Sequence, residues 1–226
     1  METSWEELAA GVLRTRLPGW DETVGAIAGP RGVLLIDAGP SPAAAGRIRA
    51  GLRALLGLPV RWVVLTHPHF DHALGAGGYP GARVFGTLGD PLELAADAVR
   101  HGMPEREAAE GVAALRGVRA RPVTGKASLY LGGGRTVSLA PFGPAHTPHD
   151  VAVKVDRTVF TGDLVEESGE PQAGPDADLA AWPGALDRLL AWGGPDARYV
   201  PGHGAVVDAA FVAAQRTALA ARAGAQ

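Results

Sequence analysis

The chain has 226 residues, of which 46% are hydrophobic and 20% are charged, and its formal net charge is -3. This length is enough to bury a sizeable core, and the small net charge gives no electrostatic reason to expect nucleic acid as a partner. There is no cysteine, which excludes disulfides, thiolate metal sites and a cysteine nucleophile.

The start of the chain, residues 1–17, carries Glu2, Glu6 and Glu7 and lacks the basic start and apolar core of a signal peptide. No apolar run has the length of a membrane span. We therefore expect a cytoplasmic protein without membrane contact, organised as a single domain over 1–226 and acting on a small-molecule substrate. The sequence is silent on the oligomeric state.

The first clear pattern is a strand, a helix and a second strand. Val33–Asp37 is a short apolar run that predicts a buried strand. Ser41 suits the N-cap and Pro42 the first position of a helix that ends near Gly57. Arg61–Thr66 then predicts the next strand, so the three elements form one unit.

Further strands and helices are predicted downstream. Three glycines at 132–134 between apolar runs predict a hairpin, and Asp156-Arg157 predicts another. Leu88–Leu115 has a helical pattern with interruptions, so we expect two pieces. The other predicted elements are a strand at Ala82–Phe85, a helix at Asp178–Trp192, a strand at Tyr199–Val200 and a closing helix capped by Asp208.

The run Thr-His-Pro-His-Phe-Asp-His at residues 66–72 is the most informative motif. It follows an apolar run, so a strand would deliver three imidazoles and a carboxylate to one rim of a sheet. Neutral imidazole and carboxylate are the ligands that borderline divalent metals such as zinc prefer. The alternative, a solvated histidine-rich turn, does not explain this spacing behind a strand. The motif predicts a metal site at His67, His69, Asp71 and His72.

Three more candidate ligands each follow an apolar run, where side chains reach the rim of a sheet. They are His146, Asp163 after a strand that ends in a glycine, and His203 between two glycines, where backbone can approach a site closely. Asp37 ends the first clear strand and could hydrogen-bond a ligand histidine.

In this order and at these strand ends, the residues resemble the metallo-β-lactamase superfamily over nearly the whole chain. The resemblance implies an α/β fold, an αββα four-layer sandwich of two mixed β-sheets flanked by helices. It also implies a dinuclear centre. In that centre His67, His69 and His146 would hold the first metal, Asp71, His72 and His203 the second, and Asp163 would bridge both.

The ligand chemistry indicates a hydrolase. Two divalent cations that share a water lower its pKa and aim the hydroxide at an electrophile. We therefore expect two zinc ions per chain, with iron or manganese also permitted. Asp71 and Asp163 are the candidate catalytic residues, and the substrate would be a small ester, thioester, lactone or related carbonyl compound.

The ligand set resembles those of glyoxalase II-like thioesterases and lactonases. β-Lactamases with a cysteine at the second metal are excluded because the chain has none. The alternatives are a mononuclear iron persulfide dioxygenase-like enzyme and a β-lactamase-like amide hydrolase. A non-catalytic binding protein with this fold would be expected to have lost ligands, and none is missing.

Some roles stay open at this point. His149 could face the substrate, support a ligand or lie on the surface. Leu88–Arg116 has the size of a lid, and a pair of ordinary surface helices is the alternative. Glu166 is expected in a solvated loop. The arginines are scattered along the sequence, so no anion clamp is predicted, and a substrate anion would have Lys126, Arg121 or a backbone site as candidates.

Overall fold

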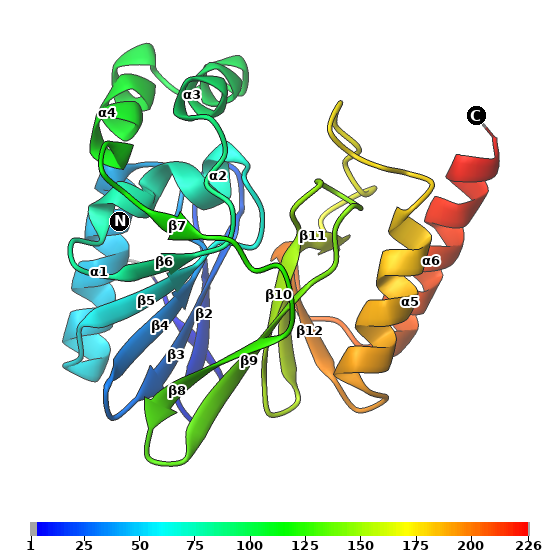
Figure 1. Ribbon diagram of the computed structural model, residues 1–226, viewed down its shortest axis with the longest axis horizontal. Coiled ribbons are helices and arrows are strands. Elements are labelled where there is room, and N and C mark those ends of the chain that lie inside the picture. Colours follow the sequence, from blue (N-terminus) through cyan, green and yellow to red (C-terminus); the bar gives the residue numbers. More distant parts are fainter. Residues whose placement is uncertain (1–3, 226) are drawn as a thin grey trace. The chain divides into compact units, whose positions relative to one another are not determined.

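Two mixed β-sheets, each with helices packed against it, make up the computed structural model (Figure 1). The structure describes residues 4–225. They divide into two compact units. The first runs to Pro122 and takes in Tyr130–Thr136, and the second comprises Val123–Leu129 and the described residues from Val137 onward. The α/β class predicted from the sequence is confirmed.

The sheet of the first unit has seven strands, which follow one another across the sheet in chain order. The first four pair antiparallel, and the last four pair parallel. Every residue of β4 is buried, as a continuous apolar run predicts. The strands are β1 (Glu6–Ala9), β2 (Val12–Arg16), β3 (Thr23–Gly29), β4 (Gly32–Ile36), β5 (Val60–Val64), β6 (Arg83–Phe85) and β7 (Ala120–Arg121).

Helix α1 (Pro42–Leu56) connects β4 to the parallel strand β5. The Ser41 hydroxyl accepts a hydrogen bond from a first-turn backbone N–H at 3.3 Å, and Gly57 ends the helix with a φ of 67°, a conformation that favours glycine. Ile48 and Leu52 of α1 belong to the same core as Val63 of the sheet. The predicted strand, helix and strand are confirmed, with both helix ends where the capping residues placed them.

Four short helical segments follow in the first unit: α2 (Phe70–Ala73), the 3-10 helix η1 (Leu74–Gly78), α3 (Pro91–Arg100) and α4 (Glu105–Leu115). The last two confirm the prediction of an interrupted helix between 88 and 115. Leu94 of α3 and Leu115 of α4 are buried in the core of the first unit. The two helices are therefore part of its packed structure.

The second unit contains a five-stranded sheet in the order β12-β11-β10-β9-β8. β9, β10 and β11 pair antiparallel, and β12 pairs parallel with β11. Helices α5 (Trp182–Gly193) and α6 (Ala209–Gly224) lie side by side and share a core with the sheet (Figure 1). The strands are β8 (Ala127–Gly132), β9 (Arg135–Pro141), β10 (Val151–Val155), β11 (Thr158–Glu166) and β12 (Arg198–His203).

The hairpin formed by β8 and β9 has a tip that packs within the first unit. The backbone N–H of Arg31 donates to the carbonyl of Leu131 at 3.0 Å, and the Arg135 guanidinium donates to the carbonyl of Ala28 at 3.3 Å. The chain thus ties this turn to the loop between β3 and β4.

Several elements differ from the sequence predictions. β1, β2, β3, η1 and β7 were not predicted, β11 runs on to Glu166, and α5 begins at Trp182 instead of Asp178. The Asp178 carboxylate accepts a hydrogen bond from the backbone of Ala181 at 2.9 Å, which holds the chain in a turn before the helix begins. Among residues 4–225, no helix combines the length and apolar character that crossing a bilayer requires.

Candidate metal centre

All seven predicted ligands carry atoms able to bind a metal ion, and they lie in two strands, in the short helix α2 and in loops that follow strands. The first unit contributes two histidines from the loop after β5 and two residues of α2. The second unit contributes one residue from the loop after β9 and one each from β11 and β12. In chain order they are His67, His69, Asp71 and His72, then His146, Asp163 and His203.

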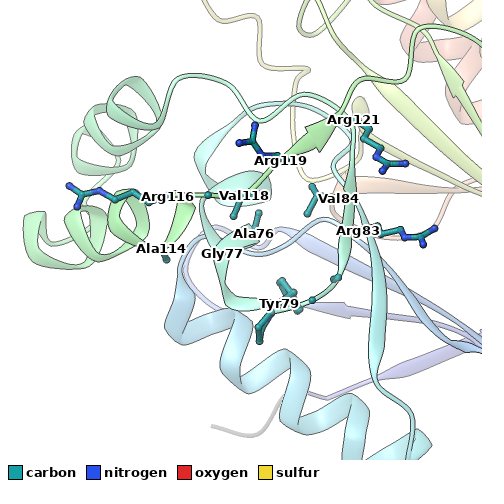
Figure 2. Close-up of a pocket in the computed structure, with 14 residues that line it drawn as sticks. Ala76, Gly77, Tyr79, Arg83, Val84, Ala114, Arg116, Val118, Arg119 and Arg121 are labelled. Carbon is teal, nitrogen blue, oxygen red and sulfur yellow. The ribbon is translucent and has the colours of Figure 1, made fainter.

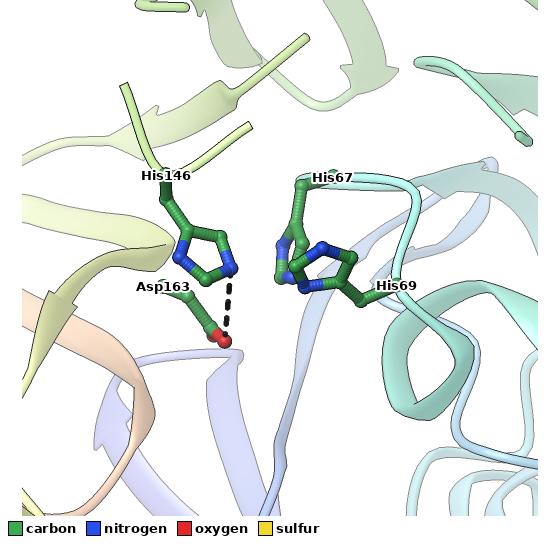
Figure 3. A group of neighbouring side chains, drawn as sticks. All are labelled: His67, His69, His146 and Asp163. Atoms are coloured by element: carbon green, nitrogen blue, oxygen red, sulfur yellow. Dashed lines mark ion pairs between the residues drawn. The ribbon is translucent and has the colours of Figure 1, made fainter. Parts of the chain in front are cut away.

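The four ligands of the first unit face one another. The ring centroid of His67 lies 4.6 Å from that of His69 (Figure 3) and 4.2 Å from that of His72. His72 Nε2 lies 3.4 Å from Asp71 Oδ2. Two ligand atoms on one tetrahedral zinc at ordinary bond lengths are about 3.3 to 3.4 Å apart. The spacing of Asp71 and His72 therefore suits a shared metal ion.

Asp37 orients two of these histidines. Its Oδ2 lies 2.9 Å from His72 Nδ1 and accepts the hydroxyl of Thr66 at 2.9 Å, while its Oδ1 accepts the Thr66 backbone N–H at 2.7 Å. Since the Thr66 hydroxyl gives its proton to Asp37, it accepts one from His67 Nδ1, 3.0 Å away. Both imidazoles then carry their proton on Nδ1 and keep the Nε2 lone pair for a metal.

The Asp37 carboxyl is itself fully enclosed. Burial raises its pKa, and the contacts with His72 and Thr66 act in the opposite direction. The neighbouring backbone adds to the same network, because the Ala38 N–H donates to the carbonyl of His72 at 2.7 Å. The end of β4 and helix α2 are therefore held together by both side-chain and backbone hydrogen bonds.

In the second unit, Asp163 lies between two histidines. Its Oδ2 is 3.5 Å from His146 Nε2, the ion pair dashed in Figure 3, and 3.5 Å from His203 Nε2. A carboxylate oxygen at this distance from both imidazole nitrogens can share one metal with each. Gly202 makes room for it, because a Cβ at this position would overlap the Asp163 carboxylate. The prediction that glycine beside His203 permits close approach is confirmed.

His146 is held by two groups from distant parts of the chain. Its Nδ1 lies 3.0 Å from the carbonyl of Gln172, so this nitrogen donates and Nε2 is left as the ligand atom. Its ring meets the edge of Trp182 at 5.3 Å, and Trp182 Nε1 donates to the carbonyl of Leu164 at 3.1 Å. The sequence does not show that Trp182 packs against a candidate ligand, and a backbone carbonyl such as that of Gln172 leaves no signal in sequence.

The turn after His146 is fixed by a buried carboxylate. Asp150 accepts hydrogen bonds from the Thr147 backbone N–H at 2.9 Å and from the Thr147 hydroxyl at 2.9 Å. Burial raises the pKa of Asp150 to about 7. His149 has an exposed side chain, and its backbone N–H donates to the Thr147 hydroxyl at 3.1 Å. The structure thus places His149 on the surface of the second unit.

Glu166 is buried, which corrects the expectation of a solvated loop. It is the last residue of β11, and its carboxylate accepts the Ser168 hydroxyl at 3.0 Å. Its backbone N–H donates to Gln215 of α6 at 3.0 Å. Burial, and next the charge of Asp163, raise the pKa of Glu166. β11 therefore continues past its predicted end near Asp163, because Gln215 of α6 provides a hydrogen-bond acceptor for the Glu166 backbone.

The family model of the metallo-beta-lactamase superfamily matches residues 17–203. The chain belongs to this superfamily. The matched residues include parts of both units and all seven predicted ligands. As a member, the protein is a metal-dependent hydrolase with His and Asp groups suited to binding metal.

Solved structures show the same fold. The metallo-β-lactamase FIM-1 of Pseudomonas aeruginosa, in its mono-zinc form, is 19% identical, with a TM-score of 0.74 over 100% of this chain and 98% of that one. A metallo-β-lactamase of Pontibacter korlensis is 21% identical, with a TM-score of 0.73 over 96% and 99%. One from Hirschia baltica is 17% identical, with a TM-score of 0.71 over 97% and 98%. None of the curated proteins compared matches the chain.

Proposed function

We propose that this superfamily member is a dinuclear zinc hydrolase of small esters, thioesters, lactones or related carbonyl compounds. The observation that carries the proposal is the position of Asp163, whose Oδ2 lies 3.5 Å from the Nε2 atoms of both His146 and His203. A carboxylate oxygen at equal distances from two imidazoles supports a role for Asp163 as the ligand that both ions share.

His67, His69 and His146 would hold one zinc, Asp71, His72 and His203 the other, and Asp163 would join the two. Imidazole nitrogen and carboxylate oxygen are ligands that zinc accepts at tetrahedral geometry. The proton positions set by Asp37 and Gln172 support the assignment, because they leave Nε2 available at His67, His72 and His146.

When bound, the two zinc ions supply a nucleophilic hydroxide at neutral pH and polarise the substrate carbonyl. The protein's own groups prepare the site for this chemistry. Asp37 and Gln172 orient imidazoles, and Asp71 and Asp163 bring negative charge to the cations. The chain also supplies no cysteine, so the nucleophile does not come from a thiol.

The first test is the metal content of protein purified without added metal. We expect about two zinc ions per chain. Asp163→Asn should lower that number and reduce turnover of an activated ester or thioester by at least about a hundredfold. Asp156→Asn is the matched control, because Asp156 lies in an exposed turn and should leave both quantities unchanged.

A pair of histidine variants tests whether His72 and His203 serve the same metal ion. His72→Ala and His203→Ala should each reduce the content to about one zinc per chain, and the double variant should also retain about one, because both residues would serve the same ion. If each unit instead held a separate metal, the double variant would retain none.

Two results would contradict the proposal. About one iron per chain, with activity towards a persulfide but none towards esters, would indicate oxygen chemistry. No metal in the purified protein, and no gain in activity when zinc is added, would show that the seven residues are not ligands.

A further inference from the structure

A second candidate site lies at the edge of the seven-stranded sheet in the first unit. A cavity of about 530 Å³ opens between η1, β6 and the segment that leads from α4 into β7 (Figure 2). This volume falls in the range of small-molecule sites, about 300 to 1,000 Å³. Of the 14 lining residues, none is acidic and four are arginines. They are Arg83, Arg116, Arg119 and Arg121.

The rest of the lining is uncharged and mostly small. Ala76, Tyr79 and Val84 are buried, with 2%, 4% and 5% of their surface exposed. The Tyr79 hydroxyl is already engaged, because it donates to the carbonyl of Ala38 at 3.1 Å. The cavity therefore combines an apolar floor with a cationic rim, a pattern typical of a site for a ligand with an organic body and anionic groups.

The four arginines form no ion pair with an acidic side chain among the described residues. Within residues 4–225, none of the four guanidinium groups forms an ion pair or hydrogen bond with another side chain. In the sequence, no acidic residue occurs between Asp71 and Asp90 or between Glu110 and Asp150, and Glu105 of α4 lines a neighbouring cavity together with Arg116. The chain as a whole has a net charge of -3, so this positive region is a local excess.

The parallel pair of β6 and β7 gathers residues that are distant in sequence. Val84 pairs with Ala120, and both pack against the core of the first unit. Side chains alternate along a strand, so Arg83 and Arg121 point away from this core. Figure 2 shows Arg83 and Arg121 on one side of the cavity and Arg116 on the other, with all three side chains directed outwards from it. The spread of the guanidinium groups reduces repulsion between like charges, and binding of an anion in the cavity requires their flexible stems to turn inwards.

We infer that this cavity binds a small organic phosphate, with its apolar or planar body against the floor and at least two phosphate groups on the arginines. Guanidinium matches phosphate by paired hydrogen bonds and also stacks on planar rings. Four cations without acidic partners match a multiply charged ligand better than a single carboxylate. The site uses none of the seven metal ligands, so the inference does not depend on the proposed reaction.

The test is calorimetric titration of the zinc-loaded protein at low salt with ADP, pyrophosphate and adenosine as probes. ADP should bind saturably and more tightly than pyrophosphate, and adenosine should not bind measurably. Arg83→Ala and Arg121→Ala should each weaken ADP binding by at least about tenfold. Arg157→Ala is the matched control, because Arg157 is exposed and does not line the cavity. Added salt should weaken the binding further.

Phosphate groups can also bind metal, so the variants must discriminate between the two sites. ADP binding that is unchanged in Arg83→Ala and Arg121→Ala, and is lost in His146→Ala, would place the phosphate at the metal centre and overturn the inference. The absence of saturable ADP binding would overturn it too, as would binding of a single-stranded oligonucleotide alone, which would assign the arginines to an extended polyanion. Unchanged zinc content and ester turnover in both arginine variants are expected if the sites are separate.

Discussion

Asp37 Oδ2 lies 2.9 Å from His72 Nδ1, and both side chains are almost completely buried. Replacing Asp37 by Asn removes the charge that holds the His72 proton on Nδ1. We expect the zinc affinity of Asp37→Asn to fall about 10-fold to 100-fold, because partners of ligand histidines typically contribute this much. Competition with a chromophoric chelator measures the affinity.

Asn is also the replacement at position 37 that disturbs the backbone least. Asp37 has a φ of 63°, which Asn tolerates better than most residues. Asp156, with a φ of 51° in an exposed turn, is the control for the same exchange. Zinc affinity that is equal in the two variants would show that Asp37 does not support the metal ligands.

Stability should depend on pH through Asp150. Its pKa is raised from the ordinary 3.8 to about 7, so the folded protein binds this proton more tightly than the unfolded chain. The stabilisation is fully present below pH 3.8 and is lost as the pH rises through about 7. Its upper limit is about 4 kcal/mol. Asp150→Asn keeps an acceptor for Thr147 and should flatten this dependence.

Urea unfolding of metal-free protein between pH 4 and pH 8 measures the effect, because zinc affinity changes with pH as well. The free energy of unfolding should decline more steeply in the wild type than in Asp150→Asn. Parallel curves for the two proteins would show that Asp150 keeps an ordinary pKa.

Gly75→Ala should destabilise the first unit by more than about 1 kcal/mol. A Cβ at this position of η1 would collide with the carbonyl oxygens of Ala38 and Gly39, and the Gly75 N–H donates to Gly39 at 2.8 Å. Gly46→Ala in α1 is the opposite case. Its Cβ would meet nothing within 4 Å, so the variant should be more stable by about 0.5 to 1 kcal/mol. Thermal unfolding of the two variants measures whether each substitution raises or lowers the stability of the fold.

Two leucines of α3 test whether this helix behaves as a lid. Leu94 is 4% exposed and packs in the core of the first unit, whereas Leu92 is 71% exposed. Leu94→Ala should cost about 2 to 5 kcal/mol, and Leu92→Ala should stay within about 0.5 kcal/mol. A negligible loss in Leu94→Ala would mean that α3 detaches easily, as the lid interpretation of 88–116 requires.

Capping residues and short motifs made part of the fold predictable. Ser41 and Gly57 marked both ends of α1, and Asp208 marked the start of α6, because each acts on backbone groups within a few residues. β1 and β2 were missed because charged residues interrupt their short sequences. Arg14 and Thr15 of β2 are buried, and Arg14 forms an ion pair with Glu6 of β1, 2.7 Å away.

The sequence predicts the ligands of the candidate site, but it does not predict the groups that hold these ligands in place. His67, His69, Asp71 and His72 occur in one short motif, so the sequence alone indicates metal chemistry. The carbonyl of Gln172 and the ring of Trp182 reach His146 only after the second unit has folded. The arginine cluster was missed for the same reason, because the pairing of β6 with β7 joins position 83 to positions 119–121.

The two histidines that share the carboxylate of Asp37 are assigned to different metal ions. His72 contacts it directly, and His67 is connected to it through the Thr66 hydroxyl. A single acidic side chain in the first unit would thus set the basicity of a ligand on each ion. Changes at this position would shift both affinities in the same direction, so a variant selective for one metal ion has to be sought among the supports that serve only one histidine, such as those around His146.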